Sequence, residues 1–584
     1  MDATPPPAAE PEPLPLPPPI ADAPLPLPAD PATHPQDDHP HPPVGFTLRR
    51  LCHIAVLLFS LFLVVRTTFV EPFGVTTGSM AETIRGNRRE KACWRCGYPV
   101  SVGSPEAGSG SNPQAWGCCP NCGAKRDPSI PLTPADRDRP PPNRIDLTGE
   151  PETFGDRLLV DKLVFRLRPP QRWEVAVFRC PEARPRKDLI DEFSALEAHL
   201  PVYEDSKPCE NRTYVKRVVG LPGERILVAD GDVYANGRIQ RKTLSQVRET
   251  RIPVFQMDYS PQPGGWAPRW EVGPPTAAGL PMVVPTKLPA VADVVQGASL
   301  VLDATATPFG LTYRHRDLDT NQDHAVRDGL GYNGKPNGSF AQRRGDDEED
   351  SRDTVPVHDF MVECEIEVVS GQGGAFAVQL GDGVDTVKVH MPIHADTSGG
   401  TAVVVLGDGT EKPFDKSFAL VPGKRYRLEF AFTDRRVSVA IDGQEVVTPI
   451  DLPEVRSDQR QPRRSIPDKA TGTQWEGAKR PAHLDCRGGH VVVHHFALWR
   501  DIHYREGSGK HGVKAECPLG SNEYFLLGDN TASSFDSREW ATPGVPEHDF
   551  LGKPFLVHQP LKATTVPVLG RVQAVDWERF RLLK

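Results

Sequence analysis

One apolar run divides this chain of 584 residues into two very unequal parts. It extends from Leu51 to Val65 and continues through Arg66 to Val70. A helix that crosses a bilayer needs about 20 mostly apolar residues. This run reaches that length when Arg66 extends its charged end toward the lipid headgroups. The sequence therefore predicts one transmembrane anchor over residues 46–70, and most of the chain follows it.

Two other interpretations of the apolar run stay open, namely the core of a signal peptide and a buried helix. A cleaved signal peptide is disfavoured because a long tail precedes the run and no small-x-small site follows it. Arg49 and Arg50 on the amino side favour a cytoplasmic N-terminus. Several basic residues between positions 85 and 91, beyond the carboxyl side, weaken that assignment of orientation.

The segment before the anchor is rich in proline. Seventeen of the first 45 residues are proline, and no Lys or Arg precedes Arg49. Such a segment cannot bury enough apolar surface to offset its ordering entropy. Residues 1–45 are therefore predicted to be a disordered, partly polyproline tail, with a ligand for a proline-recognition domain as the alternative. The net charge of −9 gives no general basic footprint, so no nucleic-acid partner is expected.

Two segments beyond the anchor hold a candidate nucleophile and a candidate base. Ser79 follows the anchor closely, and Lys216 lies in the β-rich run from Tyr214 to Val219. A serine hydroxyl is a weak nucleophile until a base takes its proton. Lysine is such a base only if burial lowers its pKa from ~10.4 toward neutrality. The run predicts a strand with Lys216 and Val218 on one face. The alternative is a surface lysine on an edge strand.

A third segment supplies polar residues that could hold the lysine. It begins at Gly528-Asp529-Asn530 and continues to Ser534, Asp536 and Arg538. The serine, lysine and Gly-Asp-Asn motifs, in this order after an anchor, resemble those of signal peptidase I, a membrane-bound Ser-Lys protease. The resemblance covers about residues 46–90, 150–240 and 520–584. It implies that Ser534 hydrogen-bonds the lysine ammonium and that the Asp536–Arg538 pair braces the loop.

The same resemblance implies the roles of the catalytic residues. Ser79 would attack the scissile carbonyl, and Lys216 would take its proton and later activate a water. The backbone N–H of Ser79 and the hydroxyl of Thr77 would form the oxyanion hole. The family's serine box reads Ser-Met-x-Pro-Thr, and here Glu82 stands in the place of the proline. This departure bears on activity.

The function implied is removal of signal peptides from exported preproteins after small-x-small, Ala-x-Ala sites. The resemblance also places the protein in the cytoplasmic (inner) membrane, in contact with lipid, with its N-terminus in the cytoplasm and its catalytic domain outside. One alternative is an inactive peptidase scaffold that presents a glycan-binding β-sandwich at the cell surface. Another is a self-cleaving Ser-Lys regulator, which the anchor and the Gly-Asp-Asn loop disfavour. No cofactor is expected for catalysis.

Two Cys-x-x-Cys pairs interrupt the catalytic segments. They are separated by 22 residues and comprise Cys93, Cys96, Cys119 and Cys122. Four thiolates at this spacing suit structural zinc, which predicts a zinc-ribbon-like insertion over residues 91–126 and a linker over 127–149. Disulfides are the main alternative, because an oxidising compartment favours them, and a redox pair is a second.

A longer insertion, residues 290–505, shows alternating strand patterns with a turn signal at Asp442-Gly443. Short strands at even spacing predict a β-sandwich, similar to concanavalin-like or laminin-G-like jelly rolls. Such domains often bind glycans or cell-wall polymers, and a structural spacer is the alternative. The fold class expected is mainly β, with an all-β catalytic core divided into residues 71–90, 150–289 and 506–584.

Overall fold

A computed structural model describes most of the chain beyond its proline-rich beginning. Residues 1–43 of the predicted tail and most of the linker at 127–149 lie outside the described residues. The described residues are 44–104, 115–124, 144–180, 213–259, 269–275, 288–316, 322–333, 354–396, 399–454, 478–506, 509–566, 570–577 and 579–583.

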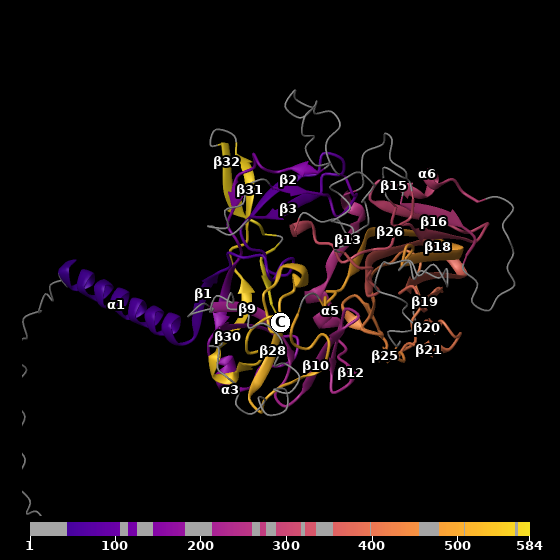
Figure 1. Cartoon of the computed structure of the whole chain (residues 1–584). Coiled ribbons are helices and arrows are strands. Elements are labelled where there is room, and N and C mark those ends of the chain that lie inside the picture. Colours follow the sequence, from indigo (N-terminus) through magenta and orange to yellow (C-terminus); the bar gives the residue numbers. More distant parts are fainter. Residues whose placement is uncertain are drawn as a thin grey trace, which may run out of the picture. The chain divides into compact units, whose positions relative to one another are not determined.

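The protein is mainly β, as predicted, and its longest helix is the predicted anchor (Figure 1). Helix α1 spans Val44–Thr68, and its part from Leu48 to Thr68 has a mean hydropathy of 2.0. It is long and apolar enough to cross a membrane, and none of this window is buried against the protein. The shorter helices are α3 (Val164–Leu167), α5 (Leu244–Thr250), α6 (Val291–Val294), η1 (Met257–Tyr259), η2 (Gly331–Asn333), η3 (Thr531–Ser533) and η4 (Glu547–Asp549).

An eight-stranded antiparallel sheet gathers strands from both ends of the folded chain. Its order is β1-β7-β30-β8-β9-β28-β29, and β33 pairs with β30. The strands are β1 (Val70–Gly74), β7 (Arg157–Asp161), β8 (Val175–Arg179), β9 (Thr213–Gly220), β28 (Glu523–Leu527), β29 (Val545–Pro546), β30 (Phe550–Val557) and β33 (Arg581–Leu582). In Figure 1 the yellow β28 lies beside the magenta β9, although an insertion separates them in sequence.

Strand β9, which holds Lys216, lies inside this sheet. It pairs with β8, where Lys216 is opposite Ala176, and with β28, where Val218 is opposite Leu526. The edge-strand alternative for Lys216 therefore does not apply. A four-stranded sheet extends from the core in the order β12-β11-β10-β27. Its strands are β10 (Arg225–Ala229), β11 (Asp232–Ala235), β12 (Arg238–Ile239) and β27 (Cys517–Pro518).

The cysteine pairs lie in a small β unit that follows the serine segment directly. Strand β2 begins at Arg88 and leads into Cys93, so the serine turn and the first cysteine pair share one continuous stretch of chain. The strands of this unit and the C-terminal hairpin are β2 (Arg88–Ala92), β3 (Pro99–Gly103), β4 (Trp116–Gly117), β5 (Ile145–Asp146), β6 (Glu152–Thr153), β31 (Leu561–Val566) and β32 (Gly570–Val575).

The long insertion forms the predicted sandwich around two long strands. The sequence pattern predicted separate strands at Phe360–Val368 and Ala375–Leu380, but these are one strand, β18 (Phe360–Gly381). It pairs with β26 (Ala482–Arg500) along its whole length. The register shifts near Gly371, where a positive φ of 135° favours glycine, and the strand bends there without ending.

On either side of this bend, β18 pairs with a different neighbour, so the sheet closes over one core. Its first half pairs with β22 and its second half with β19. The Asp442-Gly443 turn joins β23 to β24, and both turn residues have positive φ, as its sequence predicts. The other strands are β15 (Val295–Gln296), β16 (Ser299–Asp303), β17 (Phe309–Tyr313), β19 (Thr386–Ile393), β20 (Val403–Leu406), β21 (Glu411–Pro413), β22 (Arg425–Thr433), β23 (Arg436–Ile441), β24 (Gln444–Glu445) and β25 (Ile450–Asp451).

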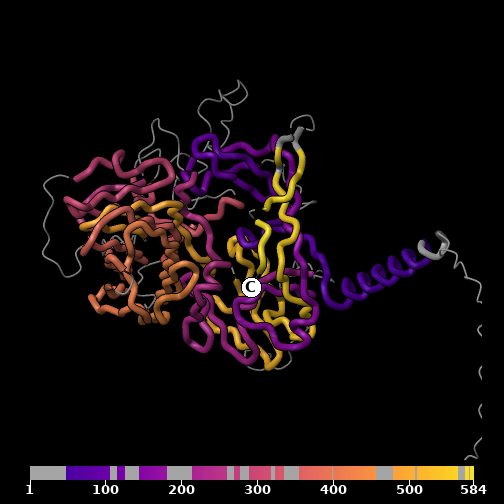
Figure 2. The backbone as a smooth tube through the Cα atoms, turned by 180° about the vertical axis from the view of Figure 1, so that it is seen from behind, coloured from indigo at the N-terminus to yellow at the C-terminus, as the bar shows by residue number. Residues whose placement is uncertain are grey.

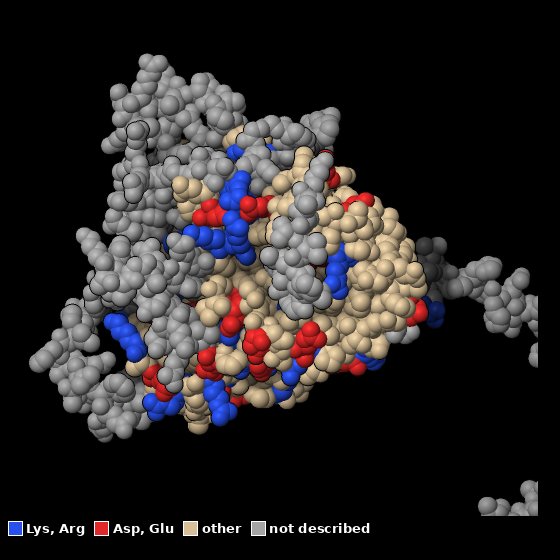
Figure 3. Space-filling model, turned by 90° about the vertical axis from the view of Figure 1, so that its right-hand side faces the viewer, with Lys and Arg blue, Asp and Glu red and all other residues tan. Residues whose placement is uncertain are grey.

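Two strands that precede residue 290 also pair with the sandwich. Strand β13 (Ile252–Gln256) pairs with β26, and β14 (Trp270–Gly273) pairs with β17. The pink-to-orange tube of the sandwich is gathered in one part of Figure 2. On the face shown in Figure 3, acidic and basic side chains are interspersed. Ion pairs also join sandwich strands, as where Arg425 on β22 contacts Glu367 on β18 at 2.6 Å.

Candidate active site

Lys216 is enclosed in the core around the eight-stranded sheet. Its side chain is 1% exposed, and its Nζ donates a hydrogen bond to Ser534 Oγ at 2.8 Å. Burial lowers the pKa of Lys216 to about 8, because desolvation outweighs the attraction of the Asp536 carboxylate, while the Arg538 guanidinium also lowers the pKa. An amine with this pKa is neutral in a substantial fraction of molecules near pH 8, and a neutral amine can accept a proton.

The loop that holds Ser534 is fixed by an internal ion pair. Asp536 accepts hydrogen bonds from Arg538 Nε at 2.9 Å and Arg538 Nη2 at 2.8 Å, and from Gly528 N at 3.1 Å. Arg538 in turn donates to the carbonyl oxygens of Arg505 and Thr531. Both members of the pair are buried, and the Arg538 guanidinium holds the pKa of Asp536 low against its desolvation. The loop is therefore anchored at both ends.

Ser79 stands in the turn that follows β1, next to the same loop. Asn530 N donates to Ser79 O at 3.0 Å, and Asn530 Nδ2 donates to Gly78 O at 2.9 Å. A Cβ at Gly528 would lie 2.1 Å from Ser534 Oγ and 2.5 Å from Ser79 O. The serine turn, the lysine's partner Ser534 and Gly528 thus meet at one point, and no residue with a side chain fits at Gly528.

The hydroxyl of Ser79 makes no hydrogen bond to another described residue. In the part of the chain that the structure describes, neither Ser79 Oγ nor Thr77 Oγ1 has a hydrogen-bond partner, and both residues are half-buried. No hydrogen bond joins Ser79 to Lys216 among these residues. Catalytic hydrogen bonds often form only when substrate binds. The structure therefore brings the predicted serine and lysine segments together without joining the two side chains.

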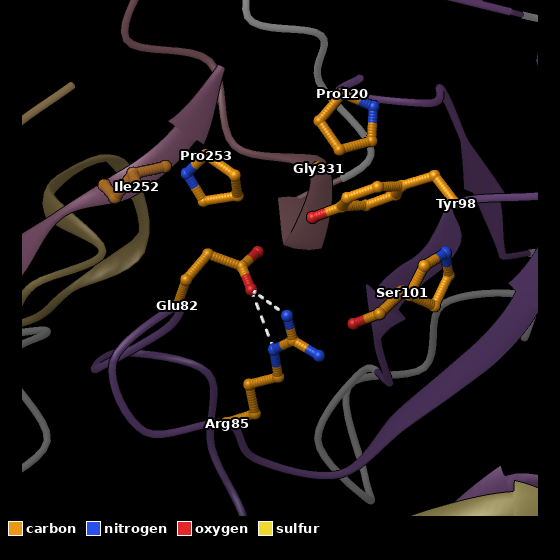
Figure 4. A pocket seen from close by; sticks show the side chains of 9 residues that line it. Glu82, Arg85, Tyr98, Ser101, Pro120, Ile252, Pro253 and Gly331 are labelled. Carbon is orange, nitrogen blue, oxygen red and sulfur yellow. Dashed lines mark hydrogen bonds and ion pairs between the residues drawn. The ribbon is translucent and has the colours of Figure 1, made fainter. Parts of the chain in front are cut away.

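Glu82 has a charge partner within its own turn. Its carboxylate accepts from Arg85 Nε at 2.7 Å, and the two side chains line one wall of a pocket (Figure 4). Counting its open mouth, the pocket encloses about 310 Å³. Its other walls come from the cysteine unit, from β13 and from η2, through Tyr98, Pro99, Ser101, Pro120, Ile252, Pro253 and Gly331.

An ion pair behind the lysine was not predicted from the sequence. Arg217 Nε and Nη2 donate to the two carboxylate oxygens of Asp529 at 2.8 and 2.7 Å, and Arg217 Nη1 donates to Trp173 O at 2.6 Å. Arg217 is fully buried. A charged residue inside an apolar strand was the available signal, but its partner lies 312 positions away. The pair holds the start of the Gly-Asp-Asn loop against β9.

The four predicted zinc ligands lie together. One sulfur atom from each of Cys93, Cys96, Cys119 and Cys122 falls within a group whose members are all within 4.8 Å of one another. The Sγ–Sγ distances from Cys93 to Cys122 and from Cys96 to Cys119 are both 3.6 Å, and all four residues are free thiols. A disulfide requires about 2.05 Å between sulfur atoms, so these four cysteines form a cluster of thiols with no disulfide among them.

The described cysteines also include one that is oxidised. Cys180, at the end of β8, is disulfide-bonded, whereas Cys364 and Cys486 in the sandwich are both free and buried. The structure therefore forms no disulfide between these two sandwich cysteines.

Comparisons with solved structures return β-sandwich proteins at low overall similarity. Galectin LEC-6 of Caenorhabditis elegans is 15% identical, with 24% of this chain and 83% of the galectin covered at a TM-score of 0.16. Carbohydrate binding module CBM66 of Bacillus subtilis is 13% identical, with 25% and 79% covered at a TM-score of 0.17. These scores are too low to support an argument about this chain, so the glycan ligand of its sandwich stays a prediction.

Sequence comparisons match parts of the predicted core and part of the sandwich. The family described as "Signal peptidase, peptidase S26" matches residues 150–267 and 394–558. A probable signal peptidase I-2 of Synechocystis sp. is 33% identical over 86 residues, 15% of this chain and 30% of the relative. Signal peptidase I of Leptolyngbya laminosa is 32% identical over 83 residues, 14% and 32% respectively. The chain thus spans about a third of the length of these curated relatives.

The family match includes the strand that carries Lys216 and the loop that carries Ser534, whereas Ser79 precedes the matched residues. One apolar helix together with this similarity fits a membrane-anchored protein. The resemblance of this chain to signal peptidase I, which its motifs predict, is confirmed by these matches.

Proposed function

We propose that this protein is a membrane-anchored serine endopeptidase that removes signal peptides from exported proteins after Ala-x-Ala sites. The observation that carries the proposal is Lys216, which is enclosed in the core, hydrogen-bonded to Ser534 and shifted to a pKa of about 8. A structural lysine on a strand is ordinarily exposed or ion-paired. A buried lysine with a lowered pKa beside a serine turn fits a general base.

In the proposed mechanism, Lys216 Nζ takes the proton of Ser79 Oγ as this oxygen attacks the scissile carbonyl. The resulting oxyanion is stabilised by the backbone N–H of Ser79 and the hydroxyl of Thr77. Collapse of the intermediate breaks the C–N bond, and the proton on Lys216 passes to the leaving amine. Lys216 then deprotonates a water that hydrolyses the ester of Ser79. Ser534 keeps the lysine in place throughout.

The catalytic part of the chain is proposed to lie outside the cytoplasm. Disulfides persist in oxidising compartments and are rare in the cytosol. The disulfide at Cys180 therefore supports an extracytoplasmic core, and helix α1 would then place the N-terminus in the cytoplasm. Protease accessibility in sealed membrane vesicles tests this topology. Protease added outside right-side-out vesicles should degrade the core and spare the tail, and the reverse pattern would contradict the proposal.

The first experiment measures cleavage of a fluorogenic Ala-x-Ala peptide by the full chain in detergent. Wild type should cleave after the second alanine, whereas Ser79→Ala and Lys216→Ala should lose activity by roughly 10³-fold or more. Ser417→Ala and Lys424→Ala, two exposed sandwich positions, serve as matched controls and should retain full activity. Absence of cleavage by folded wild type, or full activity in Ser79→Ala, would overturn the proposal.

We further propose that the cysteine tetrad holds one structural zinc ion. Tetrahedral zinc with Zn–S bonds of about 2.3 Å places its sulfur atoms somewhat less than 4 Å apart, which the two 3.6 Å distances fit. Bound zinc would cross-link the two cysteine pairs. Catalysis by Ser79 and Lys216 requires no metal in this scheme.

Metal analysis of purified protein tests the zinc site. Wild type should contain about one zinc per chain, and Cys93→Ser combined with Cys96→Ser should lose it. Cys118→Ser is the matched control, because Cys118 is buried in the same unit but is not one of the four clustered thiols. Intact disulfides among the four cysteines and no zinc in wild type would overturn this assignment.

A further inference from the structure

Residues from the sandwich insertion reach the turn that carries Ser79. Asn333, at the end of η2, exchanges two side-chain amide hydrogen bonds with Asn530, at 2.7 and 2.8 Å. Asn530 is the residue whose backbone and side chain hold the carbonyl oxygens of Ser79 and Gly78. Asn333 therefore fixes the orientation of the amide group that holds the serine turn.

The neighbouring Tyr332 fills the space between the serine turn and the cysteine unit. A Cβ at Gly78 would lie 2.1 Å from the Tyr332 ring, and a Cβ at Gly103, on β3, would lie 2.3 Å from it. The ring is 4% exposed, and Tyr332 OH donates to Asn87 O at 2.9 Å. Glycine at both positions makes room for the ring, which therefore contacts the residue immediately before Ser79.

The segment that carries these two side chains is itself fixed. Asp328 forms an ion pair with Arg505, and the carbonyl oxygens of Asp328 and Gly329 accept from Arg500 Nη2. Leu330 is 5% exposed within a core cluster that also includes Phe525 on β28. A segment held by an ion pair, hydrogen bonds to its backbone and core packing can transmit its position to the groups that it contacts.

We propose that Tyr332 and Asn333 are positioning residues for Ser79, supplied by the insertion to the catalytic core. This inference rests on the proposed function, in which Ser79 is the nucleophile. Asn333 orients Asn530, and Asn530 binds the carbonyl oxygens of the two peptide groups that flank the Ser79 Cα atom. Those peptide groups set the direction of the Ser79 N–H in the oxyanion hole and of its Cβ–Oγ bond toward Lys216.

Positioning of this kind affects the chemical step more than substrate binding. A displacement of about 1 Å in a reacting group can reduce a rate by roughly 10²-fold. Because Tyr332 contacts the serine turn and Asn333 acts on it through Asn530, their loss should lower kcat while KM changes little. A residue that served only the stability of the insertion would change the melting temperature and leave kcat at full occupancy unchanged.

The experiment uses the full chain in detergent with Asn333→Ala and Tyr332→Phe. Hydrogen exchange of the peptide covering residues 76–84 reports the serine turn independently of activity. We expect faster exchange and roughly 10-fold lower kcat in Asn333→Ala, with KM and melting temperature near wild type. Tyr332→Phe removes only the hydrogen bond to Asn87 O and should give a smaller effect in the same direction.

Two controls match these variants. Asn522→Ala changes an exposed asparagine of the core, and Tyr426→Phe removes a buried hydroxyl that accepts from Val421 N in the sandwich. Both should leave exchange at residues 76–84 and kcat unchanged. Combining Asn333→Ala with Asn530→Ala should add little to Asn530→Ala alone, because the first residue acts through the second.

The outcomes separate this inference from the proposed function. Unchanged exchange at residues 76–84 in Asn333→Ala, or faster exchange with unchanged kcat in an active enzyme, would overturn the positioning role. If wild type cleaves no Ala-x-Ala peptide, the proposed function fails, while the exchange measurement still decides whether the insertion fixes the serine turn.

Discussion

Lys216 and Ser534 are hydrogen-bonded at 2.8 Å although 318 positions separate them in the sequence. Strand β28, paired with β9, brings the Ser534 loop to the lysine, and the Asp536–Arg538 pair keeps the loop in place. The hydroxyl oxygen of Ser534 is the only hydrogen-bond acceptor for Lys216 Nζ among the described residues. Without the Ser534 hydroxyl, burial should still lower the pKa of Lys216, but no hydrogen bond would orient the lysine side chain.

Ser534→Ala tests this relationship. We expect kcat on an Ala-x-Ala peptide to fall by roughly 10- to 100-fold, because the base is no longer held toward the nucleophile. Ser534→Thr keeps a hydroxyl and should recover part of the activity. The kinetic constants of both variants should be compared with those of Ser533→Ala, which changes an exposed neighbour. Equal activity of Ser534→Ala and wild type would contradict the role assigned to this hydroxyl.

The pH dependence of cleavage should follow the neutral form of Lys216. Because burial lowers the pKa of Lys216 to about 8, the neutral amine is scarce at pH 6 and predominates above pH 8. The rate should therefore rise with pH and level off above about 8. The pH profile of kcat/KM measures the pKa of this group in the free enzyme. An ascending limb near pH 10.5, the ordinary value for lysine, would contradict the lowered pKa of Lys216.

The Arg217–Asp529 pair should contribute to stability chiefly through the charge that it neutralises. In Arg217→Met, the buried Asp529 carboxylate loses its two-point partner, and breaking such a pair costs roughly 3–5 kcal/mol. Arg225→Met removes an exposed pair with Glu516 and should cost about 0–1 kcal/mol. Denaturant unfolding of the two variants gives the difference directly. Similar losses of unfolding free energy in both variants would show that the buried Arg217–Asp529 pair stabilises the protein no more than an exposed pair does.

A group of buried carboxyl groups around Asp359, which precedes β18, should make the free energy of unfolding depend on pH. The pKa of Asp359 is raised to about 7, mainly by burial; Asp232 and Asp434 act in the same direction, and His358 opposes the shift. Asp501 also faces this group, and Lys242 forms ion pairs with Asp434 and Asp501. A raised folded-state pKa means that the protonated form stabilises the protein below about pH 4. This contribution is lost as the pH rises to 7.

Asp359→Asn should prevent the loss of stability between pH 4 and 7, because the amide stays neutral and its oxygen can still accept from Asp434 N. The melting temperature of Asp359→Asn minus that of wild type should be larger at pH 8 than at pH 5. Asp415→Asn, at an exposed sandwich position, should show no such difference. A constant offset between Asp359→Asn and wild type across this pH range would contradict the raised pKa.

The sequence predicted those parts of the protein whose signals are local. The apolar run marked helix α1, the alternating pattern marked β9, and Asp442-Gly443 marked a turn. Local patterns did not predict the single strand β18, because glycines near residue 371 read as a strand end, whereas pairing with β26 continues through them.

Contacts between distant segments had no local signal. Lys216, Ser534 and the Asp536–Arg538 pair could be named because their motifs resemble a known family. Asn333 lies in the insertion, where that resemblance gives no guidance, and its partner Asn530 is 197 positions away. Its role is visible only after both residues are placed beside Ser79.

The dependence of the serine turn on Asn530 has a consequence for biosynthesis. Ser79 emerges from the ribosome early, but the groups that fix it, Asn333 and Asn530, emerge 254 and 451 positions later by their numbers in the sequence. Lys216 likewise acquires its hydrogen-bond partner only when Ser534 has been made. A nascent chain therefore cannot assemble the proposed active site while most of it is still being translated, and the proposed peptidase activity would arise only near the end of synthesis.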